Sequence, residues 1–415
     1  MARDAIILGA GVAGLSTAVF LQRAGWAVTL LDPLGPAGGA SFGNAGLLSP
    51  ETVIPAAMPG MWRKVPRWLS DPMGPLTIRP AYLPRLAPWL ARWLAETQLS
   101  RVQANAAALR ALHAPALDVW RELLGDGPYR DMIRQNGQMQ LWEGGGGPSP
   151  LEDALRARHG IRAELLGPDE LRQIYPGLSR EVTRGLLVPG NGHVVSPARV
   201  VRSLAEQVLA EGGAILPHKA LKLIPREGGG WRVLANVAVH EASSVVVAGG
   251  AWSAELLAPL GIRLPLETER GYHAHLPSPS LELRVPILHK SRGFGLTPME
   301  DGLRAAGTVE FAGLRAPPDE RRAGQLVAHA KRLFPDLEFG TPRLWFGQRP
   351  SFPDSLPVVG AVRGRPGLHL CFGHGHFGMT GGPPSGQMLA AAMNGRAPKG
   401  LDALAPARFS GARLA

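Results

Sequence analysis

The chain has 415 residues, enough for two domains with large buried cores. Hydrophobic residues make up 45% and charged residues 19%, as in ordinary globular proteins. The net charge is +11, but the arginines are scattered without a dense basic run, which argues against a nucleic-acid partner. The single cysteine excludes an internal disulfide and favours a reducing, cytoplasmic compartment. No Cys/His cluster has metal-ligand spacing, so we expect no metal.

The first 32 residues predict a nucleotide-binding unit. An apolar strand over 6–8 runs into a G-x-G-x-x-G sequence at 9–14, and a helix is expected over 15–24. A second apolar strand over 27–31 ends in Asp32. The absence of charge over 5–22 would also fit a signal peptide or a membrane span, but the glycine spacing argues against both.

The three glycines of this turn and the acid at the end of the second strand each have a physical role. Gly9 allows the tight turn, Gly11 lets a pyrophosphate approach the backbone, and Gly14 lets helix and strand pack closely. Asp32 can accept hydrogen bonds from a ribose. The helix start also offers free N–H groups to the phosphates. The unit therefore predicts a dinucleotide-binding fold.

The middle of the chain alternates helical and strand-like segments. Residues 51–135 are rich in Pro, Trp and Arg and are expected to form irregular loops and helices. The clearest later elements are a strand over 137–142, a helix over 200–210, a buried strand at 245–248, strands from 265 to about 312, and a helix over 320–334.

A second glycine-rich strand-to-helix turn lies near the end of the chain, at 370–380. More than 300 residues separate it from the first turn. One cofactor bound by both turns would organise the whole protein. This arrangement suggests a flavin, and therefore redox chemistry.

Four segments resemble the flavin-dependent amine oxidoreductases, which include D-amino-acid oxidase, glycine oxidase and sarcosine oxidase. They are 41–50, 245–253, 347–360 and 373–375. The resemblance is greatest to the bacterial D-amino-acid dehydrogenases. It implies an α/β fold, with a Rossmann-like FAD-binding domain interleaved with an α+β substrate domain built on a mixed, largely antiparallel sheet.

We expect both domains to be discontinuous. The FAD-binding domain would comprise residues 1–50, 190–262 and 345–415. The substrate-binding domain would comprise residues 51–189 and 263–344.

The resemblance also implies which residues bind FAD. Residues 375–380 would place a helix N-terminus near the N1–C2=O edge of the flavin, where its dipole favours the anionic reduced ring. The full expected set is Gly9, Gly11, Val12, Ala13, Gly14, Asp32, Pro33, Ser41, Asn44, Ala45, Gly46, Leu47, Ala220, Gly249, Gly250, Trp252, Arg349, Gly375, His376, Phe377, Gly378, Met379 and Thr380. The alternative is that these glycines only make tight turns.

FAD is expected to be non-covalent. Relatives that bind flavin covalently have a cysteine near position 347 or a histidine near 41–46. This chain has Gly347 and no histidine between 41 and 46.

Four residues are the candidates for catalysis. The resemblance gives Arg349 a two-point ion pair with a substrate carboxylate, and a guanidinium matches a carboxylate in shape and charge. The alternative for Arg349 is a structural salt bridge. Tyr272 either hydrogen-bonds the substrate or is a half-buried strand tyrosine. His374 and His376 either move protons or only brace a turn.

The implied reaction is oxidative deamination of a D-amino acid or a related imino acid. Hydride would pass from Cα to flavin N5, and water would hydrolyse the imine to a keto acid. Three alternatives stay open: a secondary-amine oxidase of the sarcosine, glycine or cyclic amino acid type that uses O2, a NAD-dependent dehydrogenase, and a flavin-bearing subunit without its own catalysis. The residues at 351–352 and 376–377 differ from those commonest in the dehydrogenases, and would reshape the substrate pocket.

The electron acceptor is either a quinone chain or O2. Tryptophans and basic residues alternate over 58–97, at Trp62, Trp68, Trp89 and Trp93 and at Arg63, Lys64, Arg67, Arg85 and Arg92. Such a segment fits a lid with snorkelling arginines. It also fits a peripheral contact with the inner face of the membrane, which would suit delivery of electrons to a quinone.

Overall fold

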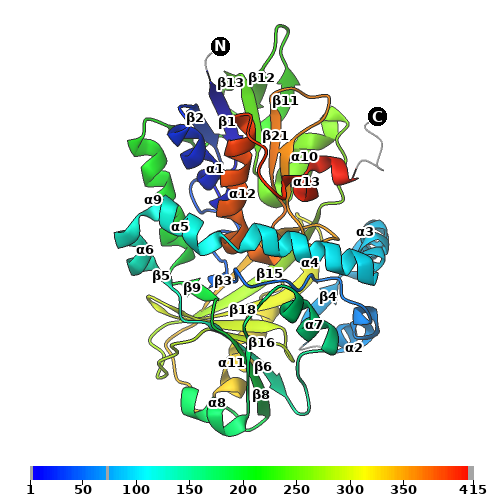
Figure 1. Ribbon diagram of the computed structural model, residues 1–415, viewed down its shortest axis with the longest axis vertical. Helices are drawn as coiled ribbons and strands as arrows, with labels where there is room; N and C mark the ends of the chain where they lie inside the picture. The colour runs from blue at the N-terminus through cyan, green and yellow to red at the C-terminus, as the bar shows by residue number, and fades with distance from the viewer. Residues whose placement is uncertain (1–2, 72–73, 410–415) are drawn as a thin grey trace.

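The computed structural model describes residues 3–71 and 74–409. The expected domains and the 58–97 segment also include residues 1–2, 72–73 and 410–415, which lie outside that part. Figure 1 shows a strand-rich region above and another below, with long helices crossing the front between them. The architecture confirms the predicted α/β fold, in which a Rossmann-like domain is interleaved with an α+β domain.

The upper region is built on a six-stranded sheet that is parallel except for its last strand. In spatial order its strands are β10 (Ala214–Leu216), β2 (Ala27–Leu31), β1 (Asp4–Leu8), β14 (Ser244–Val247), β21 (Leu368–Phe372) and β20 (Val358–Ala361). The strands are runs of Val, Ile and Leu that are buried on both faces, as expected for a parallel sheet between helical layers. A small three-stranded sheet packs on one side, formed by β11 (Ala220–Pro225), β12 (Trp231–Ala235) and β13 (Val239–Ala242).

Two helices bring the two ends of the chain together beside this sheet. The predicted first helix is confirmed as α1 (Val12–Arg23), and it packs against α12 (Gly378–Met393) and α9 (Pro197–Ala210). Figure 1 shows blue α1 beside orange-red α12, although they lie at opposite ends of the sequence. α12 contains two interior prolines, Pro383 and Pro384, which cannot donate to the helical ladder.

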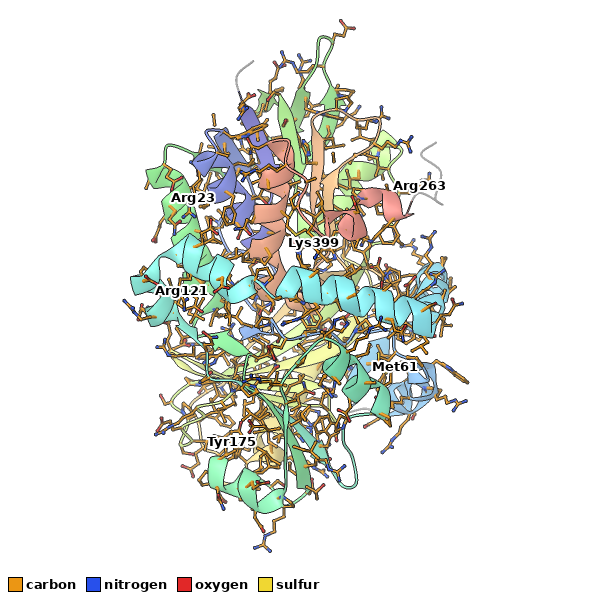
Figure 2. All side chains as sticks on the ribbon, viewed as in Figure 1. Arg23, Met61, Arg121, Tyr175, Arg263 and Lys399 are labelled. Carbon is orange, nitrogen blue, oxygen red and sulfur yellow. The ribbon has the colours of Figure 1, made fainter. Side chains whose placement is uncertain are left out.

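The lower region is built on a nine-stranded, largely antiparallel sheet. In spatial order its strands are β19 (Arg343–Ser351), β15 (Glu267–Leu276), β18 (Gly302–Phe311), β17 (Phe294–Met299), β16 (Ile287–His289), β6 (Gln138–Glu143), β8 (Val182–Val188) and β7 (Glu164–Leu166), and β4 (Leu76–Ile78) pairs with β18. One face of this sheet packs on α11 (Glu320–Leu333). Tyr175, labelled in the lower part of Figure 2, belongs to that core. The other face is turned toward the cavity described below.

A fourth sheet, of three short strands, lies between the regions. It consists of β3 (Leu47–Leu48), β9 (Gly192–Val194) and β5 (Ile133–Arg134).

The helices at the front connect the two regions. α4 (Leu99–His113) and α5 (Ala116–Leu124) pack against α12 and share its hydrophobic core, as does α6 (Asp126–Met132) through Tyr129 and Met132. The expected division of the chain gives these helices to the substrate-binding domain. α5 and α6 pack on the cofactor side, whereas α4 packs on both sides, because its Val102 and Ala106 belong to one hydrophobic cluster with Leu155 and Val188 of the lower region. The expected division therefore stays a proposal, with α4–α6 at the boundary between the two domains.

The remaining helices are short or peripheral. They are α2 (Val65–Ser70), α3 (Leu83–Glu96), α7 (Pro150–Arg158), α8 (Pro168–Ile174), α10 (Ser253–Leu257) and α13 (Leu401–Leu404), with 3-10 turns η1 (Met61–Arg63), η2 (Pro80–Tyr82), η3 (Gly250–Trp252), η4 (Ala258–Leu260), η5 (Gly375–Phe377) and η6 (Pro406–Phe409). Within the described ranges, no helix is long and apolar enough to cross a membrane.

Candidate active site

A continuous cavity of about 2410 Å³ runs from the N-terminal glycine turn to the free face of the nine-stranded sheet. Its walls come from both regions and from both ends of the chain. Met61, labelled at the right of Figure 2, belongs to its outer wall. A cavity of this size exceeds an ordinary small-ligand pocket and can hold a dinucleotide together with a substrate.

The glycine turn has the geometry that a pyrophosphate needs. Gly9 has φ +117°, and a Cβ there would lie 2.5 Å from the carbonyl oxygen of Ala248. The Val12 N–H at the start of α1 donates to Ser41 Oγ at 3.1 Å. This bond holds the loop after 40 against the helix N-terminus, where anions bind well.

Asp32 is held at the end of β2 by two backbone donors. The N–H of Ala10 donates to Oδ2 at 2.8 Å, and the N–H of Leu34 donates to Oδ1 at 2.9 Å. Burial raises the pKa of Asp32, and these two hydrogen bonds oppose the rise. Asp32 lines the cavity with oxygen lone pairs left for a ribose hydroxyl.

The loop over 41–47 is fixed by polar contacts along its length. Asn44 Oδ1 accepts from the N–H of Gly46 at 2.8 Å, and Gly46 O accepts from the N–H of Val194 at 2.8 Å. Arg304 Nη1 donates to the carbonyl oxygen of Asn44 at 2.8 Å. The loop is therefore rigid before any ligand arrives, as a preorganised cofactor site requires.

Trp345 was not among the expected site residues, yet it occupies a central part of the cavity wall. Its indole lies over Gly43 and Gly347, and a Cβ at either position would overlap its ring. The ring also stacks on His273, with centroids 5.0 Å apart. Burial lowers the pKa of His273 to about 3, so this imidazole is neutral near pH 7. Strand pairing places Trp345 beside His273, and Gly43 reaches it only through the tertiary fold, so the sequence carried no signal for this contact.

At the far end of the cavity, residue 219 has its backbone groups already paired. The N–H of Lys219 donates to Asn236 Oδ1, and its carbonyl accepts from the Asn236 N–H. Ala220 lines the cavity beside it. The resemblance places residues 219–221 beside the adenine of FAD. Leu221 also lines the cavity, so we propose that Ala220 and Leu221 make this contact.

The structure brings most of the expected cofactor residues to the cavity wall. They are Gly9, Gly11, Val12, Ala13, Asp32, Pro33, Ser41, Asn44, Ala45, Leu47, Ala220, Gly249, Gly250, Trp252, Arg349, Gly375, His376, Phe377, Gly378 and Met379. Three others lie behind the wall: Gly14 packs against Gly9, Gly46 turns the loop, and Thr380 Oγ1 accepts from the N–H of Ser49 at 3.0 Å.

Arg349 lies in the cavity wall on β19, with its guanidinium directly over Gly271. Nη1 donates to the carbonyl oxygen of Thr308 at 2.8 Å and Nη2 to that of Gly307 at 3.3 Å. These carbonyls sit at a β-bulge, where Thr308 has φ +56°. Among the described residues no carboxylate lies within 4.0 Å of the Arg349 nitrogens. Burial lowers the pKa of Arg349, and Glu269 opposes that effect.

Glu269 and His376 form a second polar group beside Arg349, and Glu269 was missed by the sequence analysis. Glu269 is paired directly with Arg349 across β15 and β19. His376 Nε2 lies 2.6 Å from Glu269 Oε2. Both residues line the cavity. In the sequence Glu269 is one acid among several in a strand, and only the register reveals its position.

Tyr272 and His374 are both part of the cavity lining, but their polar atoms are engaged elsewhere. The Tyr272 side chain belongs to the core shared with α11. Its hydroxyl donates to Glu310 at 2.5 Å and accepts from the Asp319 N–H at 2.9 Å. His374 Nε2 lies 2.9 Å from Ser385 Oγ, and burial lowers its pKa to about 4. We therefore assign neither side chain a chemical step.

The fold and the cavity define a dinucleotide-binding protein of two interleaved domains, with a helix N-terminus at each glycine turn. Residues 4–392 match the family described as FAD dependent oxidoreductase, and the chain belongs to that family. It is thus an FAD-dependent oxidoreductase. Three features of the cavity fit FAD: the glycine turn at 9–14, Asp32 with its two backbone donors, and the hydrogen-bonded loop over 41–47.

Curated relatives match over nearly the full length. The chain is 38% identical to a D-amino-acid oxidase of Bradyrhizobium diazoefficiens over 98% of this chain and 99% of the relative. It is 32% identical to a D-amino acid dehydrogenase of Vibrio vulnificus over 96% of this chain and 98% of the relative. The crystal structure of L-proline dehydrogenase from P. horikoshii has the same fold, with a TM-score of 0.74, 16% identity and coverage of 100% and 99%.

Proposed function

We propose that this FAD-dependent oxidoreductase converts a D-amino acid or a related imino acid to the imine, which water hydrolyses to a keto acid. The observation that carries the proposal is the buried Arg349 guanidinium in the cavity wall. FAD, when bound, supplies the two-electron acceptor for this oxidation. The protein's part is to bind the substrate, orient its Cα–H bond and exclude water.

Among the described residues Arg349 has no carboxylate in direct contact. Its hydrogen bonds go to two neutral carbonyls, and Glu269 acts on it only as a nearby charge. A carboxylate bound by the planar guanidinium would supply the direct ion pair. The Thr308 carbonyl fixes the plane of the guanidinium from a backbone conformation that is strained for a non-glycine residue. A substrate carboxylate is the ligand that this arrangement favours.

The substrate class is supported by two relatives above 30% identity, one named D-amino-acid oxidase and the other D-amino acid dehydrogenase. The two names differ in the electron acceptor that they imply. We propose that the acceptor is a quinone chain or O2, and production of peroxide during turnover separates them.

The segment over 58–97 supports a lid. Arg63, Lys64, Arg67 and Trp68 line the outer cavity, together with Trp89 on α3. Trp62 is 52% exposed, as a membrane-contacting residue would be. We propose the lid role and a cytoplasmic protein. Sedimentation with anionic lipid vesicles tests the alternative, a peripheral membrane contact.

The test of function is an anaerobic absorbance titration of the holoenzyme with D-, L-, N-methyl and cyclic amino acids. Loss of the oxidised flavin band with D-amino or imino acids supports the proposal. Selective bleaching by N-methyl or other secondary amines, with peroxide formed in air, would instead identify a secondary-amine oxidase. Arg349→Leu should keep the flavin and lose bleaching by any carboxylate-bearing amine. Arg315→Leu is the matched control, because Arg315 is 85% exposed and paired with Glu255.

A further inference from the structure

Beside Arg349, the cavity holds a carboxylate and an imidazole in direct contact. We propose that Glu269 and His376 form the site for the substrate ammonium, where His376 accepts a proton from the ammonium and Glu269 positions the imidazole. This inference rests on the proposed function, because it describes the same bound amino acid. Arg349 would hold one end of the zwitterion and the Glu269–His376 pair the other.

The positions of the charges match those of a zwitterion. Glu269 and Arg349 are directly opposite in an antiparallel pair, so their Cα atoms lie roughly 4.5–5.5 Å apart. In an α-amino acid the nitrogen lies about 2.5 Å from the carboxyl carbon. A carboxylate on Arg349 therefore leaves the ammonium within reach of the neighbouring anionic group. A site of this kind distinguishes amino acids from simple carboxylic acids.

Glu269 carries the negative charge that this role requires. Its exposed fraction is only 9%, and burial by itself raises its pKa. The pKa of Glu269 lies below its usual range, and the largest lowering cause is the positive charge that His376 carries once it is protonated. The hydrogen bonds from His376 and Ser351 and the charge of Arg349 also favour the carboxylate, and these three act when the imidazole is neutral. Glu269 is thus ionised near pH 7.

The other titratable groups close to Glu269 and His376 do not suit the role of anion or base for the substrate ammonium. Glu267 precedes it by two residues on β15, and burial raises the pKa of Glu267. Tyr82 donates to Glu267 Oε1 at 2.9 Å, which engages that carboxylate elsewhere. His374, in the same turn as His376, is neutral near pH 7 because burial lowers its pKa to about 4.

The hydrogen bond determines which imidazole nitrogen is the base. His376 Nε2–H donates to ionised Glu269, which leaves Nδ1 with a free lone pair. Within the described part of the chain, Nδ1 makes no hydrogen bond, and the His376 side chain is 48% exposed. This is the arrangement in which a buried carboxylate orients a histidine base and stabilises the imidazolium.

The step is a proton transfer without electron transfer. One N–H bond of the substrate ammonium breaks, its electron pair stays on nitrogen, and the proton binds to His376 Nδ1. The neutral amine then has the lone pair that imine formation requires. Solvent later receives the proton from the imidazolium.

The first experiment follows the rate of anaerobic flavin reduction against pH in Glu269→Gln and His376→Asn. At neutral pH we expect both variants to be slower by about 10²-fold, the typical contribution of a general base. The difference should shrink as pH rises toward the pKa of the substrate's own ammonium, because the free amine then needs no base. The matched control is Glu267→Gln, which removes one charge from the same strand and should keep the wild-type profile. A deficit that is constant with pH would overturn the proposal.

The second experiment measures binding and needs no turnover. 2-Methylalanine has no Cα–H and cannot be oxidised, and isobutyrate is the same molecule without the amine. Titrations that follow the flavin spectrum of the holoenzyme should show that Glu269→Gln weakens the binding of 2-methylalanine at least tenfold and the binding of isobutyrate less than twofold. Arg349→Leu should weaken the binding of both ligands. Equal effects of Glu269→Gln on the two ligands would overturn the inference.

The two proposals fail in different ways. A wild-type flavin that no amino acid reduces would overturn the proposed function. Amino acids that reduce it with no selective effect of Glu269→Gln would overturn only the ammonium site.

Discussion

The indole Nε1–H of Trp120 donates to the carbonyl oxygen of Met379 at 2.8 Å. In a regular helix this carbonyl would accept from the N–H of residue 383, but residue 383 is a proline. Trp120 on α5 thus supplies the donor that α12 lacks, in a fully buried position. The contact fixes the first turns of α12, which line the cofactor cavity.

We expect Trp120→Phe to lower the free energy of unfolding of the holoenzyme by about 1–3 kcal/mol, because a buried carbonyl loses its donor. The cost should be smaller in a Pro383→Ala background, where the new N–H of residue 383 can donate to Met379 instead. Urea unfolding of the four proteins forms a double-mutant cycle. The same cost in both backgrounds would show that packing alone explains the effect.

Gly43→Ala should lower the melting temperature and the ratio of FAD to protein, because a Cβ at 43 would overlap the Trp345 ring. Gly145→Ala is the control, since a Cβ there meets nothing within 4 Å and residue 145 is not part of the cavity lining. Trp345→Ala should make the protein tolerant of alanine at 43. If Gly43→Ala remains equally damaging without the indole, the overlap is not the cause.

Denaturation with acid should release all the FAD into the supernatant. Covalent attachment was considered at 41–46 and at 347, where the residues present include Gly43 and Gly347, both under the Trp345 ring. Cys371 is the chain's only cysteine, and burial raises the pKa of its thiol to about 12, so no thiolate is available near pH 7. Flavin absorbance that stays with the precipitated protein would contradict non-covalent binding.

We expect the protein to lose stability in acid because buried His374 has a lowered pKa. Burial lowers its pKa from 6.5 to about 4, so below pH 6.5 the unfolded chain binds a proton that the folded chain does not. Its contribution to stability is therefore present above about pH 6.5 and is lost as pH falls toward about 4. His374→Gln keeps a partner for Ser385 and should make the fall of the melting temperature across this window less steep, while His193 and His369, whose pKa values burial also lowers to about 4, keep the rest of the slope. A slope equal to that of the wild type would assign the effect to other groups.

The sequence predicted best the parts that depend on local backbone chemistry. The turn at 9–14 and the Asp32 strand end follow from glycine and a single acid, and the helix expected over 200–210 is found at 197–210. The orientation of Tyr272 was not predictable, because β15 is buried on both faces and shows no alternation of polar and apolar residues. Glu269 and Trp345 acquire their roles from strand register, which joins positions about eighty residues apart. The packing of α4–α6 on α12 likewise depends on tertiary contacts.

The six-stranded sheet combines strands that lie far apart along the chain, and the second glycine turn is synthesised more than 300 residues after the first. A chain still emerging from the ribosome has β1, β2 and the first turn, but it cannot yet complete the wall of the cavity. Cofactor capture is thus a late event in biogenesis. Loss of residues 366–415 would remove β21, the second glycine turn and α12, and with them the ability to retain flavin.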